Sequence, residues 1–424
     1  MGKPHPGIQA AGYSGVAARR RARPSRMASE RRVSASRANW VAVWVVFAGG
    51  LVAGAHIGKV PPALPVLRGD LGLTLIESGF IATMLNVMGG LVGMLAGVVC
   101  DRFGHKRLAL AGLGVMAGGG ALGAASWGFA PLLVARFFEG VGFILFTVSA
   151  GALMAAAAPA PRERAKALAL WSAYMPSGGS LALLAAPLVI GAWGWRGLWV
   201  ALALASAACF ALVARHVPAP RHGQVSSMRL IVESLAQPGN IALALLFAFY
   251  VAQWTSVMIW LPTFIVDERG GSSALAALLT ALMVLANVPG NLGGGWLLAR
   301  GVRRGPLVIA ASAIMALCSS GMLLDALPDA LRFVLVLVFS SSAGVIPASI
   351  FSGLPVHART PQHIGTGNGM VMQTSQAGQF VGPIALAWLA TRYGGWDATL
   401  WAMLALAAGG ALCGYALLRI EARP

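Results

Sequence analysis

The stretch GVVCDRFGHKR, residues 97–107, places a knot of charge inside an otherwise apolar sequence of which only 10% is charged. Its charged or titratable side chains are those of Asp101, Arg102, His105, Lys106 and Arg107. Gly97 has no side chain, so two helices can approach closely there, and Gly104 allows the positive φ of a tight turn. Asp101 can accept hydrogen bonds from nearby arginines or from the start of another helix. The pattern is more specific than a basic loop that only fixes topology.

The surrounding composition predicts an α-helical membrane protein with many spans. Of the 424 residues, 58% are hydrophobic and the mean hydropathy is +0.75. A bilayer core about 30 Å thick needs roughly 20 apolar helical residues to cross it, and runs of that length recur along the chain. We expect twelve helices, near residues 40–58, 75–99, 108–127, 131–157, 165–191, 197–214, 240–264, 274–298, 306–324, 331–354, 366–390 and 397–418.

The net charge of +18 reflects topology and not nucleic-acid binding. The first 39 residues hold nine Lys or Arg against Glu30 alone, and most remaining cations fall in loops on one expected side of the membrane. Cytoplasmic loops carry this excess of Lys and Arg, so both termini should face the cytoplasm of a bacterial inner membrane. A start at Met27 is an alternative. The expected units are a basic tail (1–39), a six-helix bundle (40–214), a central cytoplasmic loop (215–239), a second six-helix bundle (240–418) and a cytoplasmic C-terminus (419–424).

The two predicted bundles resemble each other in sequence, as expected for one duplicated six-helix unit. Three matches recur in the same order, at offsets of 196 to 201 residues. They are GVVCDRFGHKR (97–107) with GWLLARGVRRG (295–305), Pro187 with Pro383, and GWRGLWVALALASAACFAL (194–212) with GWDATLWAMLALAAGGAL (395–412).

The chain resembles the major facilitator superfamily of secondary transporters. Residues 97–107 match that family's G-x-x-x-D-R-x-G-x-R-R loop, and RFFEGVG (136–142) matches its R-x-x-x-G-x-G signature in helix four. The resemblance implies two bundles around a midplane cavity, working by alternating access. It also implies an inner-side latch, which we expect to comprise Gly97, Asp101, Arg102, Gly104, Lys106 and Arg107. Within that family the chain is loosely similar to the cyanate-porter branch. The Gly-Pro motif that drug antiporters carry in helix five is missing before Pro187 and occurs instead in helix eleven (378–383).

Two i, i+3 pairs of charged or titratable residues fall within or beside predicted spans, where a charge needs a partner or a wet cavity. Arg136 and Glu139 in helix four are either a structural ion pair or an anion site with a proton carrier; Glu139 is the leading candidate for proton coupling. His56 and Lys59 end helix one. Either Lys59 snorkels to the interface, or both residues line the mouth of the cavity and bind negative charge.

Other polar and aromatic residues within predicted spans are candidates to line the cavity, with helix packing as the alternative interpretation. Helix eleven is dense in amides, helix seven contains several aromatic residues and an amide, and helix eight has an asparagine on each side of Pro289. The candidates are Asn86, Trp171, Tyr174, Tyr250, Gln253, Trp254, Asn287, Asn291, Gln373 and Gln376.

The sequence shows no pattern typical of an enzyme, a metal site or a cofactor site. Its seven histidines lack metal spacing, and the four cysteines read as buried thiols. We therefore expect a monomeric transporter of a small anion or organic acid, coupled to protons. Efflux of hydrophobic compounds is the alternative, and a membrane sensor or enzyme is a weaker one.

Overall fold

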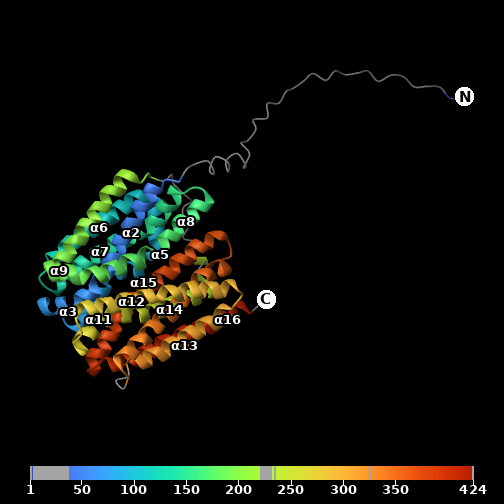
Figure 1. Cartoon of the computed structure of the whole chain (residues 1–424). Helices are drawn as coiled ribbons and strands as arrows, with labels where there is room; N and C mark the ends of the chain where they lie inside the picture. The colour runs from blue at the N-terminus through green and yellow to red at the C-terminus, as the bar shows by residue number, and fades with distance from the viewer. Residues whose placement is uncertain (1, 3–37, 220–231, 234, 324–326, 423–424) are drawn as a thin grey trace.

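The computed structural model describes residues 2, 38–219, 232–233, 235–323 and 327–422, which leaves out most of the basic tail and much of the central loop. Within these residues the chain is helical and contains no β-strand. The helices form two bundles that lie side by side (Figure 1). The all-α prediction with two six-helix bundles is confirmed.

The first bundle holds the elements before the central loop. They are α2 (Trp40–Gly58), α3 (Val60–Leu71), α4 (Leu75–Thr83), η1 (Met84–Asn86), α5 (Val87–Phe103), α6 (His105–Ala124), α7 (Phe129–Ala157), α8 (Pro161–Ser172) and α9 (Tyr174–His216). α9 is two helices joined at Gly194, whose φ of 68° turns the chain back. Within the bundle, α2 packs on α9 and α6 packs on α7.

The second bundle follows the central loop. Its elements are α11 (Pro238–Thr263), η2 (Phe264–Glu268), α12 (Ser273–Ala299), α13 (Arg304–Leu323), α14 (Asp329–His357), α15 (Pro361–Tyr393), η3 (Trp396–Ala398) and α16 (Thr399–Glu421). Here α11 packs on α15, α12 on α14 and α13 on α16.

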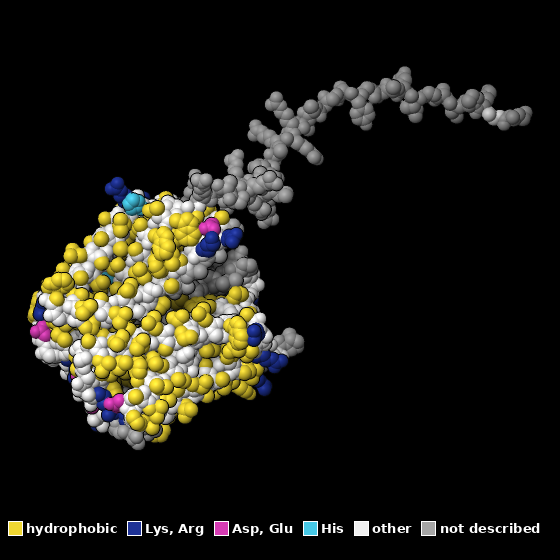
Figure 2. All heavy atoms as spheres, in the orientation of Figure 1, with side chains coloured by type: hydrophobic (Ala, Val, Ile, Leu, Met, Phe, Trp, Pro, Cys, Tyr) yellow, Lys and Arg dark blue, Asp and Glu magenta, His cyan; other side chains and the backbone are white. Residues whose placement is uncertain are grey.

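Most of these helices are long and apolar enough to cross a membrane. Ten segments among the described residues meet that criterion, and one of them, Tyr174–His216, contains both halves of α9. α15 (Pro361–Tyr393) is not among these ten segments, but its 33 residues are about 50 Å long at 1.5 Å per residue, which is enough to cross a bilayer and supplies the twelfth span. On the face shown in Figure 2, hydrophobic side chains cover the middle of the molecule, whereas Lys, Arg, Asp and Glu gather near its edges. The described chain is thus consistent with the twelve expected spans, and the protein is a multi-pass membrane protein.

Two local differences from the expected helices have a proline at their origin. The helix expected over 165–191 is divided, because α8 ends at Ser172 and α9 begins at Tyr174. Pro176 lacks an N–H and its ring would clash with the carbonyl of residue 172 in a continuous helix, but a proline is tolerated in a first turn. An unexpected helix, α3, starts after Lys59, with prolines in its first positions.

We distinguish the two ends of the bundles as the terminal end and the distal end. The terminal end carries the first residues of α2 and the last of α16, and Asn39 N–H there donates to Ala157 O at 2.8 Å. The opposite, distal end carries α3 and the bend of α9 (Figure 1). There the Arg68 guanidinium forms an ion pair with Asp267 of η2, which links the first bundle to the second. Along the middle, α15 packs against α4 and α5, and α12 packs against α9.

Hydrogen bonds within the first bundle support the segment that carries Arg68 of the distal ion pair. Trp195 Nε1 and Arg196 Nη1 each donate to Asp70 Oδ2 at 2.8 Å, and the Arg196 guanidinium stacks over the Trp195 ring. These hydrogen bonds, that from Trp195 foremost, hold the pKa of the Asp70 carboxyl below its usual range. Arg68 lies two residues before Asp70, so these hydrogen bonds also fix the segment from which Arg68 reaches η2.

Candidate functional site

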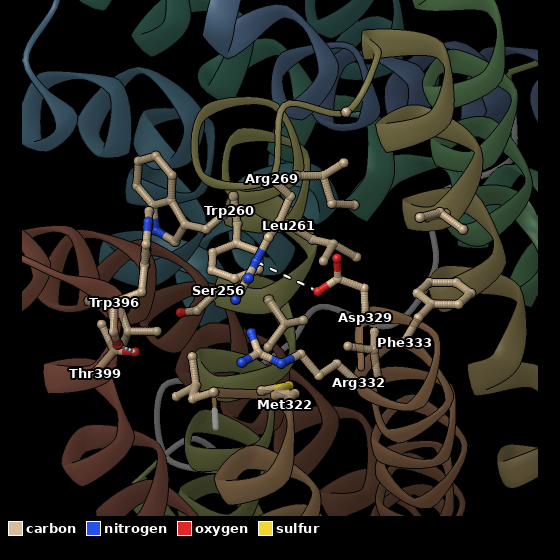
Figure 3. Close-up of a pocket in the computed structure, with 18 of the residues that line it drawn as sticks. Ser256, Trp260, Leu261, Arg269, Met322, Asp329, Arg332, Phe333, Trp396 and Thr399 are labelled. Atoms are coloured by element: carbon tan, nitrogen blue, oxygen red, sulfur yellow. Dashed lines mark hydrogen bonds and ion pairs between the residues drawn. The ribbon is translucent and has the colours of Figure 1, made fainter. Parts of the chain in front are cut away.

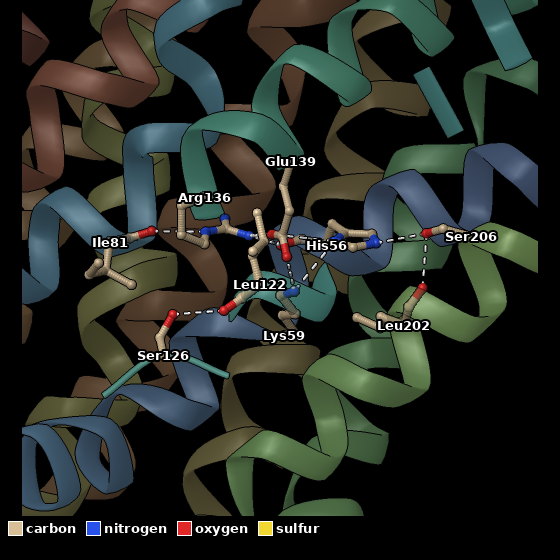
Figure 4. Close-up of polar contacts among 9 residues, drawn as sticks. All are labelled: His56, Lys59, Ile81, Leu122, Ser126, Arg136, Glu139, Leu202 and Ser206. Carbon is tan, nitrogen blue, oxygen red and sulfur yellow. Dashed lines mark hydrogen bonds and ion pairs between the residues drawn. The ribbon is translucent and has the colours of Figure 1, made fainter. Parts of the chain in front are cut away.

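The four charged or titratable residues of the two predicted pairs meet at one place inside the first bundle. His56 lies in the last turn of α2, Lys59 lies between α2 and α3, and Arg136 and Glu139 lie one turn apart on α7. All four side chains are fully buried. We call these four residues the buried cluster (Figure 4).

The only carboxylate of the buried cluster, that of Glu139, contacts all three of its other members. Lys59 Nζ donates to Glu139 Oε1 at 2.7 Å, His56 Nδ1 lies 3.3 Å from Oε2, and the Arg136 guanidinium pairs with Oε2. On its far side, His56 Nε2 lies 3.0 Å from Ser206 Oγ in the second part of α9. Glu139 is thus the hub that joins α2, α7 and the segment before α3.

Arg136 is also held by the backbone. Its Nε donates to Ile81 O and its Nη1 to His56 O, each at 3.0 Å. These bonds fix the plane of the guanidinium between α4 and α2. A planar guanidinium held in this way is preorganised to bind an oxyanion.

Donors and positive charges exceed acceptors in the buried cluster. Lys59 and Arg136 carry two formal positive charges against one negative charge on Glu139. Arg136 Nη2 is buried without a hydrogen-bond partner, and so is Nε1 of Trp199, over whose ring Lys59 Nζ lies at 4.2 Å. An unpaired buried donor is costly, so these two donors could each bind a further hydrogen-bond acceptor.

Glycines at the helix contacts bring these side chains together. A Cβ on Gly58 would lie 2.3 Å from Gly179 O, and one on Gly140 would lie 2.5 Å from Leu85 O. α2 therefore touches α9 and α7 touches η1 backbone to backbone, next to the buried cluster.

The structure overturns one interpretation of the pair at the end of helix one. Lys59 does not snorkel to the interface, because its side chain is 0% exposed. The reason is Glu139, which lies 80 residues further on and draws Lys59 inward. Arg136 and Glu139 do form the expected ion pair, but as part of a larger cluster.

A second, neutral polar group lies in the second bundle between α11, α12 and α14. Trp254 Nε1 donates to Ser340 Oγ at 2.9 Å, and Asn287 Nδ2 donates to Ser340 O at 3.0 Å and to Tyr250 Oη at 3.4 Å. Ser340, which joins these residues, was not among the sequence candidates. Serine is common in spans, so nothing in the sequence singled it out.

The other candidates divide among several places. Gln253 Nε2 donates to Met403 O of α16 at 2.8 Å, Asn86 is buried beside α7, and Asn291 is exposed on α12. Trp171 stacks on Tyr174, with ring centroids 4.1 Å apart.

Two amides of α15 lie at the contact between the bundles. Gln373 Nε2 donates to Leu91 O of α5 at 3.3 Å, and Gln376 packs where a Cβ on Gly89 would lie 2.7 Å from its Cγ. Both positions are therefore able to respond to movement of one bundle against the other.

The residues of the expected latch are only partly described. Gly104 has a φ of 92° at the start of α6, as predicted for a tight turn. Lys106 Nζ donates to Ala214 O at 2.9 Å, and Arg102 lies over the Phe103 ring. Arg107 is exposed. The surroundings of Gly97 and the side chain of Asp101 lie outside the part of the structure that is described, so the latch stays a prediction.

No group of three or more His, Cys, Asp or Glu side chains that could hold a metal ion occurs among the described residues. The cysteines described, Cys209, Cys318 and Cys413, are buried free thiols.

Residues 46–381 match the Major Facilitator Superfamily. The chain belongs to the major facilitator superfamily. In fold it is similar to a bacterial homologue of the human lysosomal transporter Spinster, with a TM-score of 0.76 and 15% identity over 92% of this chain and 98% of that one. The superfamily and the structural neighbour are transporters, so this chain is a transporter and not an enzyme.

Several curated superfamily members are similar in sequence. The chain is 25% identical to a probable sulfoacetate transporter of Cupriavidus necator, over 84% of this chain and 89% of that protein. It is 28% identical to a methylenomycin A resistance protein of Bacillus subtilis over 38% of this chain, and 31% identical to one of Streptomyces coelicolor over 30%. Those two matches span only 34% and 26% of the resistance proteins.

Proposed function

We propose that this superfamily member carries small organic anions across a bacterial inner membrane by alternating access, coupled to protons. The observation that carries this proposal is the surplus of buried donors and positive charge around Arg136 and Lys59. A charge inside the membrane is costly unless it is paired. A surplus of positive charge inside the membrane is therefore expected at a site where the ligand supplies a negative charge.

Glu139 supplies the coupling. In the structure its carboxylate occupies both Lys59 and Arg136, so an incoming anion competes with it for the same donors. Protonation of Glu139 removes its negative charge and frees those donors. Proton binding and anion binding then favour each other, which is a coupling free energy between two ligands of one site.

The neutral group around Asn287 and Ser340 is suited to the uncharged part of the substrate. Its Tyr250 and Trp254 rings offer apolar faces and the amide offers hydrogen bonds. The similarity to a probable sulfoacetate transporter agrees with this substrate class, because sulfoacetate joins a sulfonate and a carboxylate through one carbon.

The terminal end faces the cytoplasm in this proposal. The exposed Arg102, Arg107, Arg300 and Arg303 lie at or near that end, as the bias of cations towards the cytoplasm requires. The basic tail and the 97–107 latch then lie inside, and the Arg68–Asp267 ion pair lies outside. The two bundles suffice to enclose the path, so a monomer is the functional unit.

Uptake into proteoliposomes tests the proposal. We expect the purified chain to take up labelled sulfoacetate or a small carboxylate faster when the outside is acidic. Arg136→Gln should reduce uptake by about tenfold or more, since a hydrogen bond to a charged group contributes about 1.5–3 kcal/mol. The matched control is Arg300→Gln, because Arg300 is exposed and stacks on Trp296. Equal loss in both variants, or uptake indifferent to Arg136, would refute the anion site.

Efflux of hydrophobic compounds is the second candidate, favoured by the matches to methylenomycin A resistance proteins. The same vesicles distinguish the two. A carrier of hydrophobic compounds would expel a lipophilic dye under a proton gradient, and would do so without sensitivity to small carboxylates.

A further inference from the structure

The carboxylates of this protein differ in how they meet water. Asp329, which lines a cavity at the start of α14 (Figure 3), has a side chain that is 69% exposed, so it exchanges protons with water directly. Glu139 and the His56 ring beside it are 0% exposed. In this state of the carrier, a proton therefore reaches Glu139 through the groups that surround it.

The His56 imidazole joins Glu139 to a hydroxyl group on another helix (Figure 4). Its Nδ1 lies 3.3 Å from Glu139 Oε2, and its Nε2 lies 3.0 Å from Ser206 Oγ in α9. An imidazole can bind a proton at one nitrogen and release one from the other. The ring therefore has the geometry to pass a proton from the Ser206 side to the Glu139 carboxylate.

The Ser206 hydroxyl group suits both protonation states of His56 Nε2. A serine hydroxyl donates one hydrogen bond and has two acceptor lone pairs. Ser206 Oγ lies 2.9 Å from Leu202 O, one turn earlier in α9, as well as 3.0 Å from Nε2. It donates to Nε2 when that nitrogen carries no proton. When Nε2 is protonated, Ser206 accepts from Nε2–H and donates its own proton to Leu202 O, so the ring keeps its partner in both states.

The neighbouring cations favour a ring that passes a proton on over a ring that keeps two. Lys59 Nζ lies 3.4 Å from His56 Nδ1, and Arg136 Nη1 donates to His56 O. Like charges at this range disfavour a lasting imidazolium. The neutral ring has two tautomers, and each fits one state of Glu139. The Nδ1–H tautomer donates to the carboxylate, whereas the Nε2–H tautomer leaves Nδ1 to accept from the protonated carboxyl group.

We propose that His56 relays the coupling proton to Glu139, and that Ser206 is the positioning residue that accommodates both tautomers of the ring. A proton from water binds at Nε2 as the proton on Nδ1 moves to Glu139 Oε2. One N–H bond forms, another breaks, and an O–H bond forms on Glu139. The ring ends neutral and Glu139 ends uncharged, which frees Lys59 and Arg136 for an anion. This relay rests on the proposed proton coupling and adds the group that delivers the proton.

The tautomer of His56 tests the relay without any transported anion. Nitrogen NMR of the full chain in lipid nanodiscs, labelled at histidine, distinguishes the two neutral tautomers from the imidazolium, and a His56→Gln protein assigns the signal. We expect the Nδ1–H tautomer at high pH and the Nε2–H tautomer after acidification. Glu139→Gln, which resembles the protonated carboxyl group, should show the Nε2–H tautomer at both pH values, whereas Glu163→Gln on the surface should behave as the parent protein. A ring that keeps one tautomer throughout, or that accumulates as imidazolium, overturns the relay.

Uptake into proteoliposomes tests the role of Ser206. Ser206→Ala should slow uptake driven by an acidic outside by about tenfold or more, because a positioned proton-transfer group contributes about 10²–10⁴-fold. The solvent isotope effect on uptake should rise, since proton delivery then limits the rate, and Ser206→Thr should restore both values.

The matched control is Ser319→Ala in the second bundle. Ser319 is as fully buried as Ser206 and donates to Met315 O at 2.8 Å, also one turn earlier in its helix. Equal effects of the two alanine variants, or a slower Ser206→Ala carrier with an unchanged isotope effect, overturn the role of Ser206. Anion uptake by the parent protein that ignores pH would refute the proposed proton coupling, and the His56 tautomers would still decide whether the ring relays a proton.

Discussion

At the residue scale, the sequence predicted which side chains carry charge but not how they combine. Each i, i+3 pair was visible from its spacing. The contact between Lys59 and Glu139 spans 80 residues, and depends on how α2 packs on α7. No local sequence pattern predicts that packing. From the sequence, Lys59 at a helix end was therefore expected to be able to reach the membrane interface. Trp199 and Ser206 complete the site from α9 for the same reason, without any local signal.

Glu139 should be the main source of stability at the buried cluster. Glu139→Gln leaves Lys59 and Arg136 as buried charges without a carboxylate, and breaking a buried ion pair in this way costs about 3–5 kcal/mol. We expect a clearly lower midpoint of thermal unfolding in detergent. Adding Lys59→Met to Glu139→Gln should recover much of the loss, because it removes one of the uncompensated charges.

The matched control for Glu139→Gln is Glu163→Gln. Glu163 pairs with Lys166 in the same i, i+3 relation but on the surface, with Nζ and Oε1 3.0 Å apart. Exposed pairs contribute about 0–1 kcal/mol, so this variant should melt close to the parent protein. Similar melting of the two variants would show that the buried cluster is not a structural hub.

At the element scale, apolar runs and family motifs predicted the number and order of the helices, whereas their contacts depend on single glycines. α12 and α14 illustrate this point. A Cβ on Gly290 would lie 1.6 Å from Ser341 O, and one on Gly344 would lie 2.1 Å from Asn287 O. GNLGGG (290–295) contains four glycines, and the sequence alone does not tell which of them faces α14.

Two glycines of α12 should therefore respond in opposite ways to the same substitution. Gly290→Ala forces α12 away from α14 and should destabilise the second bundle by at least about 1–3 kcal/mol, the usual cost of overpacking. A side chain at Gly293 meets nothing within 4 Å, and alanine stabilises a helix by about 0.5–1 kcal/mol over glycine. Thermal unfolding of both variants checks this order; a Gly290→Ala protein as stable as Gly293→Ala contradicts the contact.

At the scale of the whole molecule, the family resemblance predicted two bundles and alternating access, but not which residues join the bundles at the distal end. Arg68 and Asp267 are 199 residues apart, and each lies beside a predicted loop where charge is ordinary. Their pairing appears only when both bundles are placed. The side chains are 30% and 37% exposed, so the ion pair can form and break in contact with water as the bundles move.

A charge exchange across the distal end tests whether that ion pair biases the whole carrier. Arg68→Asp and Asp267→Arg each place like charges together, and each should favour the state that is open at the distal end. An exposed pair contributes up to about 1 kcal/mol, which is roughly a fivefold change in population. The double variant restores opposite charges and should return the population to that of the parent protein. The rate at which a cysteine placed at Gly69 is labelled measures the open fraction. The difference in labelling rate between the single variants and the parent protein should shrink in high salt, because exposed charges are screened. A double variant that is labelled as fast as the single variants would show that the Arg68–Asp267 ion pair does not favour closure of the distal end.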